Sequence, residues 1–484
     1  MLCLTLTGNT LEKNTEYIEL YHTMSDLCEL RIDLLEQMNL QDIIAFSQQA
    51  QLPLILTCRR ERDGGAYRRT DRTRTGQLNR LLREGTWAYV DLEEDFRRGE
   101  LEQIARERNI RIIRSFHDMQ RVPADLFSRI ERIAAKGEIP KAAVTALNIR
   151  DALTLFSAEQ QLAHIEKKII LAMGDYGVPT RILYRRTGSL LTYASPPGTS
   201  AAPGHLDIES MKHIYRSDQV NSQTNIYGII GNPVLHTASP RIHNPAFHKV
   251  GINAIYVPFL VDDVRTFFTF ADRLSVKGFS VTVPHKQQVL PYLGRITREV
   301  KQIGSCNTVV WEREYWKGIN TDYYGFLRPI LNLLDGERIK RAAVIGAGGA
   351  ARAVVWALRN HQCSVVILNR TPQRAEELAR QTGSSWAALD DTASISQVDL
   401  IVQTTSVGMA PDTDADPLPG YTFRGDEVVY ELIYTPEMTA FMKRAKLSGC
   451  SLVPGKQMLL GQGIMQFETF TGLNYPFTED TVVF

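Results

Sequence analysis

The chain is poor in cysteine and lacks long hydrophobic runs. Its 484 residues contain 6 cysteines, scattered singly, whereas zinc sites and disulfide scaffolds need paired or dense cysteines. We therefore expect buried free thiols in a reducing compartment. No stretch reaches the roughly 18 apolar residues of a transmembrane helix, and residues 1–6 lack the basic start and apolar core of a signal peptide. These absences predict a cytoplasmic protein without a membrane partner.

The sequence also has no excess of charge of one sign. Lysine and arginine total 55 and aspartate and glutamate 54, a net charge of +1, so no long-range field attracts nucleic acid. Residues 59–74 are locally rich, with seven arginines and three acidic residues. The interspersed acids and the Gly64-Gly65 turn indicate a loop that closes over a carboxylated substrate, with the outer arginines solvated, rather than a nucleic-acid patch.

What the chain does contain is enough apolar residues for large cores. Hydrophobic residues make up 44%, which argues against disorder, and the length corresponds to roughly three domains of about 150 residues. Up to about residue 216, short apolar runs alternate with amphipathic stretches. The eight candidate strands are residues 2–6, 27–34, 53–58, 87–92, 110–115, 142–145, 169–173 and 190–194. This alternation predicts a (β/α)8 TIM barrel, whose chemistry gathers where the strands open into loops.

Further α/β patterns follow the barrel. Residues 207–216 have helical apolar spacing, and the polar run 217–224 is the predicted linker. A second α/β unit opens at Ile226, and a third begins near residue 340.

The third unit carries a dinucleotide signature. A strand ending at Ile345 runs into a glycine-rich turn and a helix, which lets backbone amides approach a pyrophosphate. About 20 residues on, Arg370 stands where an NAD enzyme carries an acidic residue. A guanidinium there binds a 2′-phosphate that a carboxylate would repel, so we predict NADP, supplied as NADPH. The predicted cofactor-binding residues are Gly346, Gly348, Gly349, Ala350, Asn369, Arg370 and Thr371.

Five ordered strings in the C-terminal half are unusual. They are GNPVLHTASPRIHN at 231–244, SVTVPHK at 280–286, GSCNT at 304–308, GINTD at 318–322 and GKQMLLGQ at 455–462. Together they resemble shikimate dehydrogenase over residues 226–484. The resemblance implies that Lys286 and Asp322 form the catalytic pair and that Met409 contacts the cofactor. It assigns substrate binding to Thr237, Ser239, Thr282, Asn307, Tyr434 and Gln462.

The chemistry of the pair agrees with this resemblance. Reduction of a ketone leaves a developing alkoxide, and a lysine oriented by a carboxylate can deliver the proton without a metal. The chain has no His-Glu-x-x-His motif or cysteine cluster, so we expect no metal. Thr237 and Ser280 depart from the family's serine and asparagine; both keep a hydroxyl, so we expect substrate contact to survive and selectivity to shift toward quinate.

The resemblance also implies that residues 455–484 belong to the second α/β unit, which begins near Ile226. The predicted domains are a barrel at 1–216, a linker at 217–224, an α/β substrate domain at 225–335 and 455–484, and a Rossmann NADP domain at 336–454.

Ordered strings also mark the N-terminal half. They are ELRID at 29–33, TCRRERDGG at 57–65, SFHD at 115–118, IPKAAV at 139–144, MG at 173–174 and AAPG at 201–204. They resemble type I 3-dehydroquinate dehydratase over residues 1 to about 216. The resemblance implies a Schiff-base lysine at Lys141 and a general acid/base at His117, oriented by Asp63. It assigns substrate binding to Glu29, Arg31, Arg59, Arg181 and His205.

A lysine mechanism is physically reasonable at this position. Beside the apolar residues Ile139 and Ala142, Lys141 would lose hydration, which favours the neutral amine that attacks a ketone. The chain departs from the family where Asp63 replaces glutamate, Ala201 replaces serine and His205 replaces glutamine.

The two resemblances predict a bifunctional shikimate-pathway enzyme. It would dehydrate 3-dehydroquinate to 3-dehydroshikimate and reduce that product to shikimate with NADPH. One alternative is a quinate-preferring dehydrogenase, and another is a barrel retained only as a scaffold or a regulatory ligand-binding domain. The sequence leaves the oligomeric state and substrate channelling open.

Overall fold

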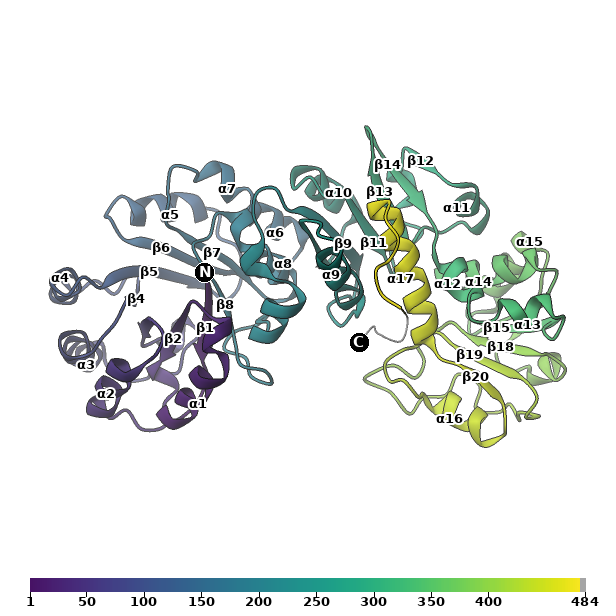
Figure 1. The fold of residues 1–484 in the computed structure, drawn as a ribbon, viewed down its shortest axis with the longest axis horizontal. Coiled ribbons are helices and arrows are strands. Elements are labelled where there is room, and N and C mark those ends of the chain that lie inside the picture. The colour runs from purple at the N-terminus through teal and green to yellow at the C-terminus, as the bar shows by residue number, and fades with distance from the viewer. Residues whose placement is uncertain (479–484) are drawn as a thin grey trace. The chain divides into compact units, whose positions relative to one another are not determined.

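The apolar runs of the N-terminal half form eight strands, as predicted. The structure, a computed structural model, describes residues 1–478. Its first sheet has parallel strands in the order β7-β6-β5-β4-β3-β2-β1-β8 (Figure 1). The strands are β1 (Leu2–Leu6), β2 (Leu27–Arg31), β3 (Leu54–Thr57), β4 (Tyr89–Glu93), β5 (Arg111–Asp118), β6 (Ile139–Thr145), β7 (Ile169–Met173) and β8 (Thr192–Ala194). This arrangement confirms the predicted TIM barrel.

Helices follow the strands and cover the outside of the barrel (Figure 1). Thr10, Asn39, Thr70 and Asn148 begin four of them, each with a side-chain oxygen that accepts a backbone N–H of the first turn. The helices are α1 (Leu11–Tyr21), α2 (Leu40–Gln49), α3 (Asp71–Glu84), α4 (Gly99–Glu107), α5 (Leu126–Ala134), α6 (Ile149–Phe156), α7 (Ala158–Gln161) and α8 (Val178–Ile182).

The inward-facing residues of the barrel form two layers of opposite character. The lower layer is apolar and comprises Cys3, Leu27, Ile55, Tyr89, Ile113, Ile139 and Ile169. Because side chains alternate along a strand, the residues two positions on face the same way. Six of those residues are polar, namely Thr5, Glu29, Thr57, Asp91, Ser115 and Lys141, and the seventh is Leu171. The polar layer therefore forms the floor of a site, and the buried apolar layer lies beneath it.

A mixed sheet follows the barrel in the chain. Its order is β10-β9-β11-β13-β14-β12, and β13 runs antiparallel to both β11 and β14. The strands are β9 (Asn225–Gly231), β10 (Ala254–Leu260), β11 (Gly278–Val281), β12 (Arg295–Ile296), β13 (Thr308–Glu312) and β14 (Tyr315–Ile319). The helices of this part are α9 (Ser239–Lys249), α10 (Val264–Arg273), α11 (Arg298–Ile303), α12 (Asp322–Leu327) and α13 (Leu331–Asp335).

The last sheet is parallel throughout. Its order β17-β16-β15-β18-β19-β20 is the 3-2-1-4-5-6 order of a Rossmann fold, which confirms that prediction. The strands are β15 (Arg341–Ile345), β16 (Ser364–Asn369), β17 (Ser385–Ala388), β18 (Leu400–Gln403), β19 (Val428–Glu431) and β20 (Ser451–Val453). The helices are α14 (Gly349–Asn360), α15 (Pro372–Thr382), α16 (Ala440–Leu447) and α17 (Gly455–Thr471).

The described residues pack into two compact units. Unit 1 comprises Met1–Gly228, Pro233–Pro240 and Asn253–Ser275, and unit 2 comprises Ile229–Asn232, Arg241–Ile252 and the chain from Val276 onward. Within unit 1, α6 packs on α10, where the rings of Phe156 and Phe270 lie 5.4 Å apart and perpendicular. The predicted domain boundaries stay predictions, and residues 479–484 of the predicted 455–484 segment lie outside the described residues.

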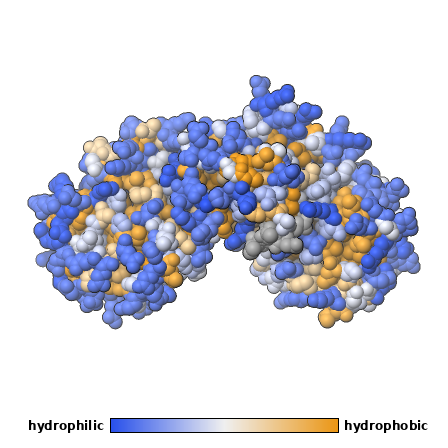
Figure 2. Space-filling model, in the orientation of Figure 1, coloured by the Kyte–Doolittle hydropathy of each residue, from blue (hydrophilic) through white to orange (hydrophobic). Residues whose placement is uncertain are grey.

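Two expectations from composition can be compared with the structure. All six cysteines are free and buried, as predicted. Within residues 1–478, no helix is both long and apolar enough to cross a membrane. Hydrophilic residues cover most of the face seen in Figure 2.

Candidate active sites

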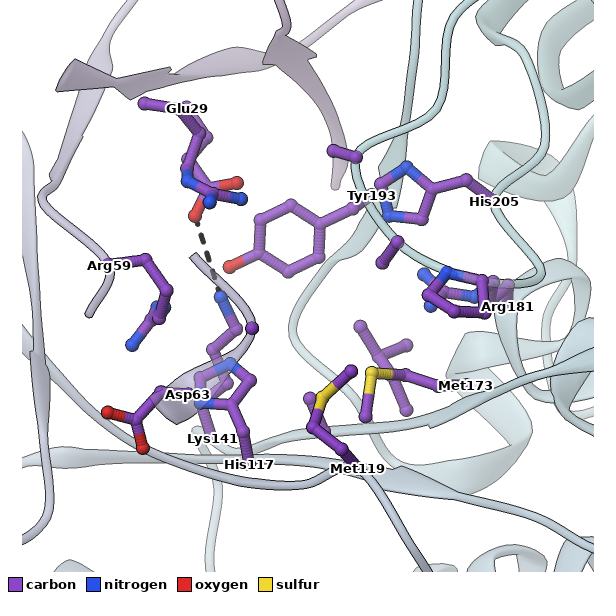
Figure 3. A pocket seen from close by; sticks show the side chains of 17 residues that line it. Glu29, Arg59, Asp63, His117, Met119, Lys141, Met173, Arg181, Tyr193 and His205 are labelled. Atoms are coloured by element: carbon purple, nitrogen blue, oxygen red, sulfur yellow. Dashed lines mark ion pairs between the residues drawn. The ribbon is translucent and has the colours of Figure 1, made fainter. Parts of the chain in front are cut away.

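One pocket at the top of the barrel gathers the residues predicted for the N-terminal half. Its cavity volume is about 90 Å³, and charged and polar side chains make up much of its lining. Side chains reach it from β2, β5, β6, β8 and α8 and from the loops after β3 and β8 (Figure 3). The predicted residues that line it are Glu29, Arg31, Arg59, Asp63, His117, Lys141, Arg181 and His205.

Lys141 is buried among charged and aromatic groups. Its Nζ lies 2.9 Å from Oδ2 of Asp91, 3.6 Å from Oε1 of Glu29 and 4.2 Å from the ring centre of Tyr193 (Figure 3). The expected loss of hydration is confirmed, since Lys141 is buried, but the groups around its Nζ are charged and aromatic, and of its two apolar neighbours in sequence only Ile139 faces the barrel interior. Ala142 faces the opposite side of β6 and packs in the outer apolar cluster, since alternate strand residues face opposite ways.

Asp91 is held by an arginine as well as by the lysine. The Nη2 atom of Arg59 lies 2.7 Å from Oδ2 of Asp91, and its Nη1 lies 3.2 Å from Glu93 and donates to Ser115 Oγ at 2.8 Å. Burial opposes ionisation, but Arg59 and Lys141 hold the pKa of Asp91 below its usual range. Sequence reasoning missed Asp91, Glu93 and Ser115. The signal was two acids spaced by two within an apolar run, because buried acids need partners.

A second carboxylate fixes Arg31. Asp33 accepts from Nε and Nη2 of Arg31 at 2.9 and 2.7 Å and from the backbone N of Ala66 at 3.0 Å. Its side chain is fully buried. Asp33 therefore joins the end of β2 to the loop after β3.

Arg181 differs from the other two pocket arginines. It is buried, its Nε has no hydrogen-bond partner, and no carboxylate in residues 1–478 pairs with it. Burial lowers its pKa to about 10. The pocket thus holds one arginine whose charge is not matched by an acid.

His117 and Asp63 line the pocket without a direct bond at Nδ1. The Nδ1 atom of His117 has no partner, while Asp63 accepts from Nε of Arg60 at 2.8 Å. Burial, with the charges of Arg59 and Lys141, lowers the pKa of His117 well below its usual value. The imidazole is consequently neutral near pH 7.

The arginine-rich segment is only partly solvated. Arg62 and Arg68 are exposed, but Arg60 and Arg74 are buried. Arg74 pairs with Glu93 at 2.6 Å and stacks over Phe96. The expectation that the outer arginines are solvated is wrong for Arg74, because an acid from β4 compensates its charge.

Unit 2 contains the lysine and aspartate predicted for reduction. Lys286 Nζ lies 2.5 Å from Oδ2 of Asp322, whose Oδ1 accepts from Asn307 Nδ2 at 2.8 Å. The Oδ1 atom of Asn307 accepts from the backbone N of Thr321 at 2.7 Å. Asp322 begins α12, so the carboxylate is fixed by both the helix start and Asn307.

The glycine-rich turn lies against this pair. A Cβ added to Gly349 would come within 3.0 Å of Lys286 Cδ, and one added to Gly346 (φ +115°) within 2.4 Å of Thr404 Oγ1. The turn therefore requires glycine at Gly346, and a side chain at Gly349 would crowd Lys286. Gly348 faces open space at the start of α14, as a pyrophosphate site needs.

The end of β16 presents the predicted phosphate ligand. Arg370 is exposed, and within residues 1–478 it has neither an ion pair nor a hydrogen bond. Asn369 donates from Nδ2 to the carbonyl of Thr371 at 2.9 Å, which shapes the turn that presents Arg370. Ala350 lies in the first turn of α14, and the exposed Met409 follows β18.

The remaining predicted substrate residues are divided between the two units. In unit 1, Thr237 Oγ1 donates to Ser239 Oγ at 3.1 Å. In unit 2, Gln462 donates to the carbonyl of Leu459 at 2.8 Å. Thr282 follows β11, and Tyr434 follows β19.

Ser280 makes a structural contact, and the expected contact of its hydroxyl with substrate stays a prediction. Its hydroxyl donates to Gln466 Oε1 at 2.8 Å in the buried interior. Gln466 in turn donates to Thr308 Oγ1 at 3.0 Å. This departure from the family pattern therefore supports β13 with its hydroxyl.

No group of three or more histidine, cysteine, aspartate or glutamate side chains within residues 1–478 could hold a metal ion. The acids of the two pockets are instead paired with lysine and arginine.

The folds of the two halves and the residues of their sites together indicate a class of protein. A barrel with a buried lysine pocket precedes a Rossmann unit whose glycine turn adjoins a lysine–aspartate pair, the layout of a chain that joins a lyase to a nicotinamide-dependent oxidoreductase. Family models agree in both halves. The type I 3-dehydroquinase model matches residues 2–222, the shikimate dehydrogenase substrate binding domain 229–309, and shikimate/quinate 5-dehydrogenase 332–410.

Individual relatives identify the family. A chloroplastic bifunctional 3-dehydroquinate dehydratase/shikimate dehydrogenase of Arabidopsis thaliana is 32% identical over 98% of this chain and 83% of its own length. An NADP(+) shikimate dehydrogenase of Moorella thermoacetica is 41% identical over 53% of this chain and 92% of its own. The crystal structure of Aquifex aeolicus shikimate dehydrogenase, 37% identical, covers 53% of this chain and 96% of its own with a TM-score of 0.50. The chain belongs to the bifunctional 3-dehydroquinate dehydratase/shikimate dehydrogenase family.

Proposed function

We propose that this chain catalyses two consecutive reactions. The barrel dehydrates 3-dehydroquinate to 3-dehydroshikimate, and the C-terminal half reduces that product to shikimate with NADPH. Family membership over both halves supports the pair of activities. The observation that carries the residue roles is the pocket at the top of the barrel, which Lys141 and His117 line together with three arginines.

Lys141 is the proposed nucleophile. Its amine adds to the substrate ketone, and loss of water leaves an imine that draws electrons from the adjacent carbon. Asp91 and Glu29 flank the Nζ atom and offset the positive charge of the protonated imine. The Tyr193 ring over Nζ adds a cation–π contact with the same charge.

His117 is the proposed proton shuttle. As a neutral imidazole it removes a proton from the carbon beside the imine, which gives an enamine. The enamine then expels the β-hydroxyl, and His117 returns the proton so that water leaves. Hydrolysis of the imine frees the product and restores Lys141.

Arg181 is the proposed receptor for the substrate carboxylate. Arg31 and Arg59 already form ion pairs with Asp33 and with Asp91 and Glu93. Arg181 alone of the three lacks an acidic partner, so an incoming carboxylate gains the most there.

In the second site Lys286 is the proposed proton donor. When the ketone is reduced, the ammonium held by Asp322 gives its proton to the developing alkoxide. Bound NADPH supplies the two electrons. Gly346, Gly348 and Gly349 fit its pyrophosphate, and Arg370 fits the 2′-phosphate because no acid within residues 1–478 pairs with its guanidinium.

A coupled assay tests the whole proposal. 3-Dehydroquinate and NADPH, incubated with this chain alone, should give shikimate with equimolar loss of NADPH absorbance. Formation of 3-dehydroshikimate without shikimate would refute the second activity, and unchanged 3-dehydroquinate would refute the first. The location in the cytoplasm stays a prediction.

A further inference from the structure

The loop after β8 is fixed to the end of β7 by two glycines. Gly174 donates its backbone N–H to the carbonyl of Pro203 at 3.2 Å. Gly204 has φ +74°, and a Cβ there would lie 2.5 Å from the carbonyl oxygen of Gly174. Only glycine permits this approach. The loop therefore presents the next residue, His205, as part of the pocket wall.

His205 faces cations from three other elements. Arg181 on α8, Arg31 on β2 and Lys141 on β6 are the charges that act on it. Figure 3 shows His205 and Arg181 on one side of the pocket and Lys141 with Asp63 on the other. The remaining ionisable groups that line the pocket are Glu29 on β2, Arg59 and Asp63 after β3, His117 on β5 and Tyr193 on β8.

The acids of the pocket are engaged elsewhere. Glu29 accepts from Thr57 Oγ1 at 3.0 Å and contacts Lys141, and Asp63 accepts from Arg60. The Nδ1 atom of His205 has no hydrogen-bond partner. Burial and then the charge of Arg181 lower the pKa of His205 well below its usual value. His205 is therefore neutral near pH 7 in these surroundings.

A bound carboxylate reverses this balance. It offsets the charge of Arg181 and offers an anionic acceptor, to which a charged imidazolium donates a stronger bond than a neutral group does. We propose that His205 is a proton-dependent ligand of the substrate carboxylate, so that substrate binding draws a proton onto it and the dehydratase site binds more tightly as pH falls. This inference rests on the proposed dehydratase function and on Arg181 as the carboxylate receptor.

The direction of the pH dependence follows from linkage. A group that gains its proton on binding strengthens affinity as pH falls through its bound-state pKa, and the gain levels off below its free-state pKa. One such group changes KM by at most about tenfold per pH unit. Glutamine, the residue expected here from the family resemblance, can donate a hydrogen bond but takes up no proton.

The test compares wild type with His205→Gln from pH 6 to pH 8. The variant-to-wild-type ratio of KM for 3-dehydroquinate cancels the titration of substrate, Lys141 and His117. We expect this ratio to be at least about fivefold larger at pH 6 than at pH 8, with an unchanged kcat ratio. His164→Gln is the matched control, because His164 is exposed and lies outside the pocket; its ratio should stay flat. A flat ratio for His205→Gln would overturn the inference.

A binding measurement separates this inference from the proposed function. Quinate has a carboxylate but no ketone, so it forms no imine with Lys141. Calorimetric titration with quinate at pH 6.5 in two buffers of different ionisation enthalpy counts the protons taken up, and any uptake at the dehydrogenase site is common to both proteins. Wild type should take up more protons than His205→Gln, and equal uptake would overturn the inference. If wild type dehydrates nothing yet shows this difference, the proposed dehydratase fails while the proton-linked carboxylate site stands.

Discussion

Asp33 offers the sharpest test of how the barrel pocket is held together. Its buried carboxylate accepts two bonds from Arg31 and one from Ala66. Removing one partner of a buried ion pair costs about 3–5 kcal/mol, and an amide would retain part of the hydrogen bonding. We therefore expect Asp33→Asn to lower the free energy of unfolding of the barrel by about 3 kcal/mol.

The assay is the temperature of half-inactivation of each activity. A loss of about 3 kcal/mol in a unit of this size lowers that temperature by roughly 6–12 °C for the dehydratase. The same variant should raise KM for 3-dehydroquinate, because Arg31 is no longer held. Its dehydrogenase midpoint should fall by less, because the Lys286–Asp322 pair and the Rossmann sheet belong to unit 2. Asp95→Asn is the matched control, since Asp95 pairs with Arg60 but its side chain is 58% exposed, and such a pair contributes about 0–1 kcal/mol.

The stabilisation that Asp33 provides should depend on pH. Burial raises its pKa, but the bonds from Arg31 and from backbone N–H groups lower it by more, so the net pKa is below the usual value. Its contribution to stability is thus present above the unfolded pKa near 4 and is lost as pH falls through the folded pKa. The stability difference between wild type and Asp33→Asn should shrink in strong acid. A difference below about 1 kcal/mol at pH 7 would refute the reasoning.

Further predictions concern the two lysines, the cofactor and the linker. Borohydride with 3-dehydroquinate should attach the substrate covalently to Lys141, and labelling of another lysine instead would contradict its role. Lys141→Ala should abolish dehydration but spare reduction of 3-dehydroshikimate, and Lys286→Ala should do the reverse. Arg370→Ala should weaken NADPH far more than NADH in fluorescence titrations, because only NADPH carries the phosphate; equal losses would count against the assignment. Cleavage within 217–224 should leave fragments that co-elute in gel filtration, because Phe156 packs on Phe270, whereas separate elution would show that this contact is weak.

The sequence predicted all eight barrel strands but made two of them too short at the site, one at its end and the other at its start. The predicted strand 110–115 continues through His117, and the predicted strand 142–145 begins before Lys141. Both side chains are polar yet face the barrel interior, where the apolar pattern predicts hydrophobic residues. A strand limit drawn from hydrophobicity therefore stops where the polar side chains proposed as catalytic begin.

The pairing of charges was the part that sequence could not supply. Arg74 lies in α3, a helix whose charged sequence predicts exposure to solvent, and its partner Glu93 comes from β4. Asp91 meets Lys141 across 50 positions of sequence. Local composition indicates how many charges a segment has, but only the register of neighbouring strands decides which of them meet.

The two sites place a lysine beside carboxylates for opposite purposes. Lys286 has one close acid, and Asn307 holds the other oxygen of that acid, so the lysine is oriented as its proposed role of proton donor needs. Lys141 shares Oδ2 of Asp91 with the guanidinium of Arg59. Glu29 Oε1 lies 3.6 Å from the same Nζ, so Lys141 has two close acids where Lys286 has one. These acids offset the positive charge of the proposed imine, and the neutral His117 in the same pocket suits its proposed role as the base.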